Sequence, residues 1–354
     1  MLSCGFGPPV LTSGDVAHRR LTAQQVRLMA HIAPPGIGAP SYLLADALTG
    51  EVLLARNEHD RRSPASMTKM VTALVALERA RQDLELTVER QDVRGMYSVL
   101  YLKQGEELSL RQLLFMLLIS SDNAAANTIA RGVAGDVDTF VGWMNEYVQQ
   151  LGLHDTHFAN PHGYDDPENY STAFDMAAIG RHAMNNPVIA DIVRRPTAIA
   201  AWRNLESTNE LLVTYPGAVG IKTGTTDEAG ECLAALADRP TGRALAVVMG
   251  SEHRFHDSRL LLDYYYATYA ELHLDLPPNA QNRFADLNYE WHTVGLESPV
   301  TILVRPWQLG AVSMYRRIDQ VQPNPSPAEP IGSLLIHLDG RLLWQEPLYV
   351  RQSS

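Results

Sequence analysis

The chain has 354 residues, which is enough for two domains or for one large domain with an appendage. An apolar fraction of 45% and a charged fraction of 19% are typical of a globular protein, and no apolar run is long enough to span a bilayer. The formal net charge of −11, with no basic run, argues against a nucleic-acid surface and favours small molecules or peptides as partners.

The first 40 residues are predicted to be an N-terminal segment and linker, ending in a Pro/Gly-rich stretch over residues 33–40. Residues 1–5, Met-Leu-Ser-Cys-Gly, resemble the end of a bacterial lipoprotein signal, in which the cysteine becomes lipidated. This resemblance implies lipid attachment at Cys4 and a signal segment upstream; the alternative is a free thiol on a disordered end. The other cysteine, Cys232, lies in an apolar stretch that predicts a buried strand, and we assign it no function.

Residues 41–274 are predicted to form one α/β domain of the α+β type. A β-hairpin over residues 42–55 comes first, a largely helical block follows from Ser66 to about Asn186, and strands return at 218–221, 231–237 and 243–249. A helix is expected from Asp257 to Leu272. The simplest assembly is one antiparallel sheet made of the hairpin and the later strands, with the helical block inserted and a groove where insert and sheet meet.

Residues 275–354 are predicted to form a small β-rich C-terminal domain. Its signals are a strand at 300–304 and a hairpin over 334–343, whose Asp339-Gly340 pair favours a tight turn.

Only three lysines occur in the chain, although Lys and Arg together number 29. A lysine can lose its proton when it is buried, whereas an arginine cannot, so a lysine kept in an arginine-rich chain is a candidate base. Lys103 lies in a polar segment and is expected to be solvated. Lys69 and Lys222 both lie in short polar motifs.

Ser66-Met67-Thr68-Lys69 places a hydroxyl and an amine three residues apart at a predicted helix start after Pro64. A helix N-terminus disfavours a protonated lysine and favours anionic oxygen, so this pair is a candidate nucleophile and base.

Two further motifs are weak when each is taken alone. Ser121-Asp122-Asn123 supplies a hydroxyl and an amide, but it is equally typical of a helix N-cap. Lys222-Thr223-Gly224-Thr225 ends a predicted strand, where Gly224 would let a peptide approach, but an ordinary strand-to-turn passage fits as well.

Taken together and in this order, Ser-x-x-Lys, Ser-Asp-Asn and Lys-Thr-Gly are the signature of penicillin-binding proteins and serine β-lactamases. The chain most resembles the serine-type D-alanyl-D-alanine carboxypeptidases, the low-molecular-mass penicillin-binding proteins. The resemblance runs from about residue 41 to 272, with a looser likeness in the C-terminal β domain. Further stretches carry the resemblance: residues 46–50, 64–69, 160–163, 170–177, 220–225 and 229–233. It implies a penicillin-binding protein/serine β-lactamase-like fold.

The resemblance also implies a mechanism and a set of site residues. Ser66 would attack the D-Ala-D-Ala carbonyl with Lys69 as base, Ser121 would pass a proton to the leaving amine, and Asn123 would hold the substrate amide. The backbone N–H groups of Ser66 and Thr225 would form the oxyanion hole. The residues implied in substrate binding are Lys222, Thr223, Gly224, Thr225 and Arg254, the last of which could instead be an ordinary surface arginine.

The implied substrate is a peptidoglycan stem peptide ending in D-Ala-D-Ala, with β-lactams as covalent inhibitors and with no cofactor or metal. Such a substrate requires an extracytoplasmic location in the cell envelope. One alternative is a serine β-lactamase, for which Glu168 lies in the relevant region, and another is a non-catalytic cell-wall-binding protein on the same fold. His162 in the central loop is interpreted as structural.

Overall fold

The structure is a computed structural model that describes residues 32–276, 282–319, 323–338 and 340–351. The predicted lipid site at Cys4 lies outside these residues. The chain divides into two compact units, one spanning Pro34–Tyr266 and the other beginning at Ala267. Within the described ranges, none of the helices has the length and apolarity that crossing a membrane demands.

The first unit contains a five-stranded sheet in the order β2-β1-β9-β8-β7, with every neighbouring pair antiparallel. The N-terminal hairpin therefore pairs with a strand that follows the helical block, as Ser41 opposite Met249 shows. This confirms the predicted antiparallel sheet. The strands are β1 (Ser41–Asp46), β2 (Val52–Arg56), β7 (Ala218–Thr226), β8 (Gly230–Arg239) and β9 (Gly242–Ser251).

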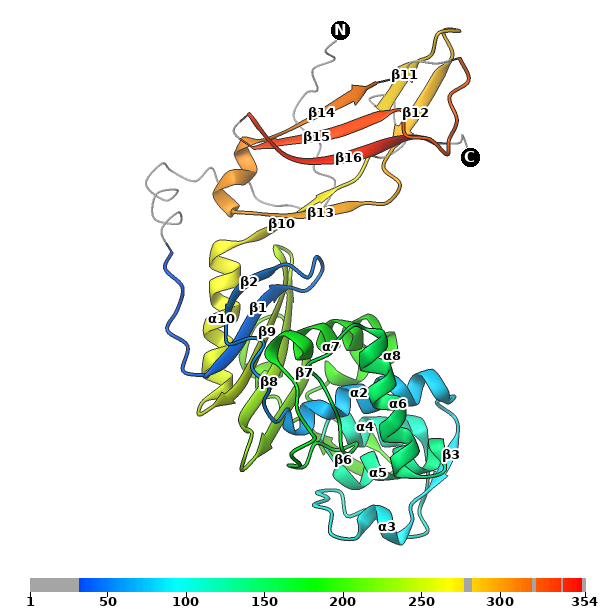
Figure 1. The fold of residues 1–354 in the computed structure, drawn as a ribbon, viewed down its shortest axis with the longest axis vertical. Coiled ribbons are helices and arrows are strands. Elements are labelled where there is room, and N and C mark those ends of the chain that lie inside the picture. The colour runs from blue at the N-terminus through cyan, green and yellow to red at the C-terminus, as the bar shows by residue number, and fades with distance from the viewer. Residues whose placement is uncertain (1–31, 277–281, 320–322, 339, 352–354) are drawn as a thin grey trace. The chain divides into compact units, whose positions relative to one another are not determined.

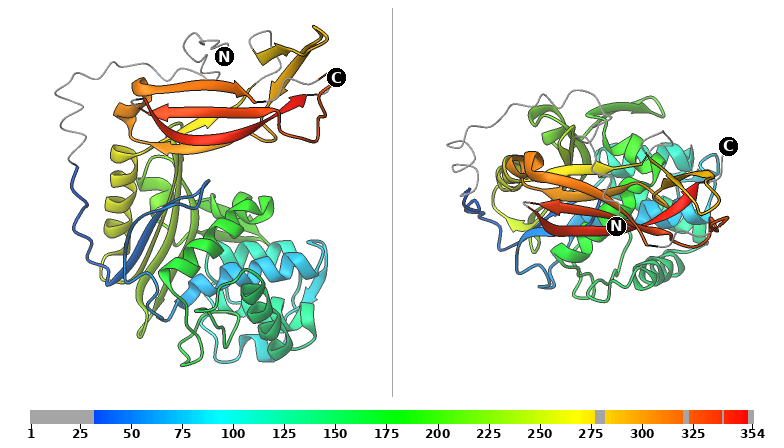
Figure 2. Two further views of the ribbon diagram at one scale, coloured as in Figure 1. Left: turned by 45° about the horizontal axis from the view of Figure 1, so that its top comes forward. Right: turned by 90° about the horizontal axis from the view of Figure 1, so that it is seen from above.

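Helices cover both faces of this sheet, which explains why its middle strands are continuous apolar runs. Figures 1 and 2 show α10 (Arg254–Thr268) on one face and α7 (Ala173–Asn185) with α8 (Pro187–Val193) on the other. The Tyr265 hydroxyl of α10 donates to Asp46 of β1 at 2.6 Å, so the helix is tied to the sheet by polar as well as apolar contact.

The helical insert is built around α2 (Lys69–Arg79), whose first eight residues are all buried. Side-chain caps start the helices around it: Ser109 accepts from the main chain of α4, and Asp122 does the same for α5. The elements of the insert are η1 (Ala65–Thr68), β3 (Glu85–Thr87), α3 (Arg90–Val93), β4 (Glu107–Ser109), α4 (Leu110–Leu118), α5 (Asn123–Ala134), α6 (Val137–Gln150), β5 (Thr197–Ala200), β6 (Arg203–Glu206) and α9 (Leu211–Thr214).

The second unit is β-rich, with one sheet in the order β11-β12-β16-β15-β14 and a separate β10-β13 pair (Figure 1). The strand predicted at 300–304 and the hairpin predicted over 334–343 are both present. The elements are β10 (Ala270–Leu274), β11 (Arg283–Ala285), β12 (Trp291–Gly295), β13 (Val300–Val304), η3 (Pro306–Ala311), β14 (Val312–Ile318), β15 (Gly332–Leu338) and β16 (Arg341–Arg351).

The helix predicted from Asp257 to Leu272 both begins and ends earlier in the structure. It begins at Arg254 and ends at Thr268, after which Ala270–Leu274 forms β10. Alternate residues of this strand, Ala270, Leu272 and Leu274, are buried, and the strand pairs with β13. Five residues are too few for their alternation to be distinguished from a helix end without the pairing partner.

Candidate active site

Ser66 lies in the short 3-10 turn η1, directly before α2. It is partly exposed, whereas Ala65, Met67, Thr68 and Lys69 around it are buried. Ala65 adopts a left-handed conformation, with φ of 48°, which a residue other than glycine seldom does. The fold therefore turns the chain sharply at this point, with only the serine side chain reaching the surface.

Lys69 is the first residue of α2, and its side chain is fully buried. Its Nζ lies 2.8 Å from Ser66 Oγ, 2.6 Å from Asn123 Oδ1 and 2.7 Å from the main-chain oxygen of His162. Burial, with a smaller contribution from the positive charge of Lys222, holds the pKa of this amine well below its ordinary value.

These contacts match the bonding capacity of a neutral amine. A neutral amine donates two hydrogen bonds, here to Asn123 Oδ1 and the His162 carbonyl, and its lone pair faces the third partner. That partner is the Ser66 hydroxyl, whose proton the lone pair can accept. The geometry and the lowered pKa of Lys69 thus support the same chemistry.

The Ser-Asp-Asn motif occupies the tight turn between α4 and α5, where Ser121 has a φ of 60°. Asp122 caps α5 by accepting from the main-chain N–H of Ala125 at 3.0 Å. Asn123 accepts from Lys69 and donates from its amide nitrogen to the Tyr97 carbonyl at 3.2 Å. The N-cap interpretation is therefore correct for Asp122. The side chains of Ser121 and Asn123 instead contact the lysines of the other two motifs.

Lys222 is buried in β7, and its Nζ donates to Ser121 Oγ at 2.8 Å and to the Thr223 carbonyl at 3.0 Å. Burial, followed by the charge of Arg254, lowers its pKa to about 7. The hydroxyl of Thr223 is hydrogen-bonded to that of Thr208. A chain of contacts thus connects the third motif to the second.

Gly224 allows β7 to lie directly against the nucleophile turn. A Cβ at this position would be 2.9 Å from the Pro64 oxygen, closer than side chains tolerate, and 3.1 Å from the Ser66 nitrogen, which is a tight contact. Because β7 is an edge strand of the sheet, its outer side is free of a neighbouring strand of that sheet. The partly exposed Ser66 and the exposed Thr225 flank this close approach.

Arg254, the first residue of α10, lies against the same strand. Its guanidinium donates to the Gly224 carbonyl at 3.0 Å and to the Thr225 hydroxyl. The structure therefore brings all the predicted site residues into one region: Ser66, Lys69, Ser121, Asn123, Lys222, Thr223, Gly224, Thr225 and Arg254.

The central loop contributes a main-chain group that sequence reasoning missed. The His162 carbonyl accepts from Lys69, while the buried imidazole accepts from the N–H of Tyr164 through Nδ1 at 3.2 Å. Burial and the nearby Lys69 lower the imidazole pKa to about 3. The imidazole bonds within its own loop, and its structural interpretation stays a prediction. No residue type marks a carbonyl as a ligand of the amine, and the neighbouring Gly163 was the one local signal.

Three residues outside the predicted site have ordinary surroundings. Lys103 is exposed, and Glu168 is also exposed, with its main-chain oxygen accepting from His157. Cys232 is buried in β8, and burial raises its thiol pKa to about 11, which makes it a poor nucleophile.

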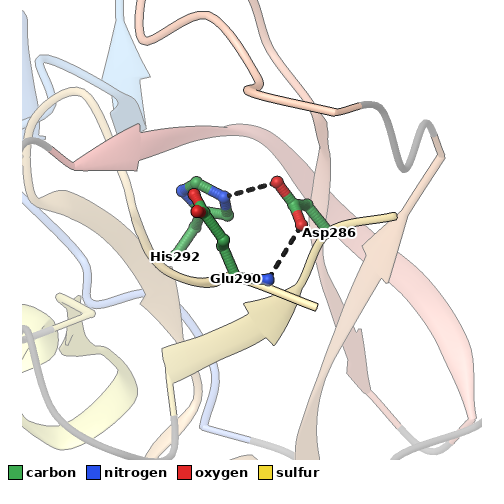
Figure 3. A group of neighbouring side chains, drawn as sticks. All are labelled: Asp286, Glu290 and His292. Atoms are coloured by element: carbon green, nitrogen blue, oxygen red, sulfur yellow. Dashed lines mark hydrogen bonds and ion pairs between the residues drawn. The ribbon is translucent and has the colours of Figure 1, made fainter. Parts of the chain in front are cut away.

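Asp286, Glu290 and His292 of the second unit form a cluster of metal-ligand type (Figure 3). One oxygen of Asp286 already accepts from the N–H groups of Asn288 and Glu290, and the other accepts from His292 and from the N–H of Asn324. Burial raises the Asp286 pKa, but these bonds outweigh it and lower the pKa to about 2. The cluster is explained as the polar centre of a turn.

Comparison with known proteins agrees with this geometry. Residues 29–253 match the family model described as D-alanyl-D-alanine carboxypeptidase. The carboxypeptidase DacF of Bacillus subtilis is 30% identical over 98% of this chain and 92% of its own. DacB2 of Mycobacterium tuberculosis is 37% identical over 60% of this chain and 74% of its own.

A solved structure is similar along nearly the whole chain. Penicillin-binding protein 5 of Haemophilus influenzae superimposes with a TM-score of 0.77 at 27% identity, covering 91% of this chain and 99% of the other. The resemblance thus includes the second unit as well as the site. The chain belongs to the D-alanyl-D-alanine carboxypeptidase family.

Proposed function

We propose that the protein is a serine-type D-alanyl-D-alanine carboxypeptidase that removes the terminal D-alanine from peptidoglycan stem peptides. The observation that carries this proposal is the buried Lys69 amine with its lowered pKa, 2.8 Å from the oxygen of a partly exposed serine. A serine beside a neutral amine is an activated nucleophile. Family membership supports peptides ending in D-Ala-D-Ala as substrates and β-lactams as ligands.

Acylation follows from the positions of these groups. Lys69 takes the hydroxyl proton while Ser66 Oγ forms a bond to the carbonyl carbon of the penultimate D-alanine. The carbonyl oxygen becomes an oxyanion, for which the N–H groups of Ser66 and Thr225 are the proposed donors. The C–N bond then breaks, the leaving amine takes a proton through Ser121, and D-alanine departs.

The substrate's carboxylate end is assigned to the third motif. Lys222 and Arg254 supply positive charge, and Thr223 and Thr225 supply hydroxyls beside it. Asn123 is the proposed donor to the substrate's amide. Because β7 is an edge strand, an extended peptide can align along its outer side.

The test is release of D-alanine from an N-acylated L-Lys-D-Ala-D-Ala peptide by the wild-type chain and by Ser66→Ala. Release by the wild type that disappears in Ser66→Ala, together with loss of covalent labelling by a fluorescent penicillin, is the expected result. Ser313→Ala in β14 makes the same chemical change in the other unit and should retain both. If the folded wild type releases no D-alanine but hydrolyses penicillin with rapid turnover, the protein is a β-lactamase. If it binds penicillin but neither releases D-alanine nor hydrolyses penicillin, it is a binding protein.

We also infer that the enzyme works outside the cytoplasm, where peptidoglycan lies, and that a lipid on Cys4 attaches it to the membrane. Growth of the producing bacterium with an alkyne fatty acid tests the lipid. We expect the wild type to be labelled and the label to disappear in Cys4→Ser. Cys232, the other cysteine of the chain, is buried and therefore protected from modification. An unlabelled wild type would remove the inference.

A further inference from the structure

Three large aromatic side chains are exposed beside the candidate active site. Tyr97 is 73% exposed, Tyr101 is 78% exposed and Trp202 is fully exposed. Tyr97 and Tyr101 lie in the loop that precedes β4, and Trp202 is at the tip of the β5-β6 hairpin. Large exposed aromatic side chains are candidates for binding residues, because a ring left in water buries no apolar surface in the fold.

The loop carrying the two tyrosines is bonded directly to the second motif. The Asn123 amide donates to the Tyr97 carbonyl, and Asp122 accepts from the Ser98 hydroxyl at 2.6 Å and from the N–H of Leu100 at 3.4 Å. The main chain from Tyr97 to Leu100 is therefore held next to Asp122 and Asn123, and Asn123 contacts Lys69.

The hairpin carrying Trp202 is fastened to the same loop through Arg203. The Arg203 guanidinium donates to the Leu100 carbonyl at 2.9 Å and pairs with both oxygens of Glu106 at 2.8 Å. Trp202 precedes Arg203 and Tyr101 follows Leu100, so these bonds join the main chain beside one aromatic residue to the main chain beside the other. We call Tyr97, Tyr101 and Trp202 the aromatic ridge.

The other end of the hairpin reaches the third motif. Ser120 donates to the Glu206 carbonyl at 3.3 Å, and Thr208 just beyond β6 is hydrogen-bonded to Thr223. One continuous segment thus connects the tip of the ridge, at Trp202, to the strand that is proposed to bind the peptide's carboxylate.

The backbone at the tip is costly to hold. Ala200 pairs with Arg203, so Ala201 and Trp202 form a two-residue turn, with φ values of 45° and 61°. Such turns favour Asn-Gly, and each left-handed residue other than glycine costs roughly 1–2 kcal/mol. A fully exposed tryptophan in this position contributes little to the core, which favours a role in binding.

The surrounding charge favours a neutral ligand. The loop and hairpin carry Arg94, Lys103 and Arg203 alongside Glu106 and Glu206, so neither sign predominates. The chain as a whole is negative, at −11, which disfavours an anionic lipid surface. Sugar rings fit better, because their C–H faces stack on aromatic rings while their hydroxyls bond to mixed polar groups.

We propose that the aromatic ridge binds the sugar rings of the glycan strand from which the stem peptide hangs. The inference rests on the proposed function, since a stem peptide bound along β7 must lead back to its glycan. In peptidoglycan the carboxyl group that joins sugar to peptide is an amide, so the disaccharide is neutral, as the ridge requires. The enzyme should therefore prefer peptides still attached to their disaccharide.

The test compares kcat/KM for D-alanine release from a pentapeptide attached to its muramyl disaccharide with that from the same N-acetylated pentapeptide. Trp202→Asn and Tyr101→Asn are suitable variants, because asparagine tolerates positive φ. Each should lower the ratio of the two kcat/KM values about 10-fold, mainly through KM, as expected for one lost stacking contact. Trp291→Asn is the matched control, since Trp291 is 70% exposed in the second unit, and it should leave the ratio unchanged.

Binding of a muramyl disaccharide that carries a simple amide in place of the peptide, and is therefore neutral, is measured by calorimetry on Ser66→Ala. This measurement separates the inference from the proposed function because it requires no catalysis. Binding that Trp202→Asn weakens supports the ridge even if no D-alanine is released. An unchanged ratio in both ridge variants, or an equal loss on both substrates, overturns the inference. So does Trp202-dependent binding to anionic phospholipid vesicles without disaccharide binding, which would make the ridge a membrane contact.

Discussion

Replacement of Gly163 by alanine should disable the nucleophile turn while leaving the fold largely intact. Gly163 follows the carbonyl that accepts from Lys69, and its φ is 87°. A Cβ at this position would lie 1.9 Å from the Ala65 oxygen and 3.0 Å from the Ser66 nitrogen. The methyl group would therefore meet rigid main chain rather than the end of a flexible side chain.

The size of the effect follows from this overlap. An ordinary contact begins at 3.4 Å, so the Ala65 oxygen and Gly163 must separate by about 1.5 Å, the difference from 1.9 Å. A misplacement of about 1 Å at a reacting group costs about 100-fold in rate. Overpacking costs about 1–3 kcal/mol, and the positive φ adds about 1–2 kcal/mol. We expect acylation to slow at least 100-fold and the free energy of unfolding to fall by about 2–5 kcal/mol.

The assay is the second-order rate constant of Ser66 acylation by a fluorescent penicillin. It is measured at a temperature at which a thermal unfolding curve shows the variant to be folded. Gly135→Ala is the matched control, because Gly135 has a φ of 91° and an added methyl group there would have no atom within 4 Å. It should lose about 1–2 kcal/mol of stability and acylate within twofold of the wild type. Acylation by Gly163→Ala within threefold of the wild type would refute the claim that this contact positions Ser66.

Three further predictions concern other contacts. Arg254→Gln should move the alkaline limb of the pH profile of kcat/KM to a pH above its wild-type position near 7. Burial is the main cause of the low Lys222 pKa and the Arg254 charge is the second, so loss of this charge should raise the pKa. A limb that does not move would exclude Lys222 as its source. Ser121→Ala should lower kcat about 100- to 10,000-fold in D-alanine release, since the leaving amine loses its proton route, and a loss below threefold would argue against that role. Arg131→Met should lower the free energy of unfolding in urea by about 3–5 kcal/mol, because Asp92, which is 1% exposed, loses its 2.8 Å ion pair; an unchanged midpoint would contradict this.

The sequence alone carried much of the site's chemistry. Three signals are local: the Ser66 to Lys69 spacing, the capping residue Asp122 and the glycine after Thr223. Each depends on residues within a turn of one another. The hairpins and the apolar runs of β8 and β9 are local in the same sense, which is why the antiparallel sheet was predicted correctly.

Other features depended on contacts that no local pattern encodes. The carbonyl of His162 faces Lys69 only because the central loop packs against η1, and Arg254 reaches Gly224 only because α10 starts beside β7. The strand at Ala270–Leu274 needed its partner β13, since five alternating residues are ambiguous alone.

The sequence by itself determined which groups are available for chemistry, because residue type and short spacing set hydrogen-bonding capacity and helix or strand preference. Only the tertiary structure decided that Lys69 is buried with two fixed acceptors, and that Trp202 is fully exposed. Burial and the resulting pKa depend on segments far apart in the chain, which sheet pairing and helix packing bring together.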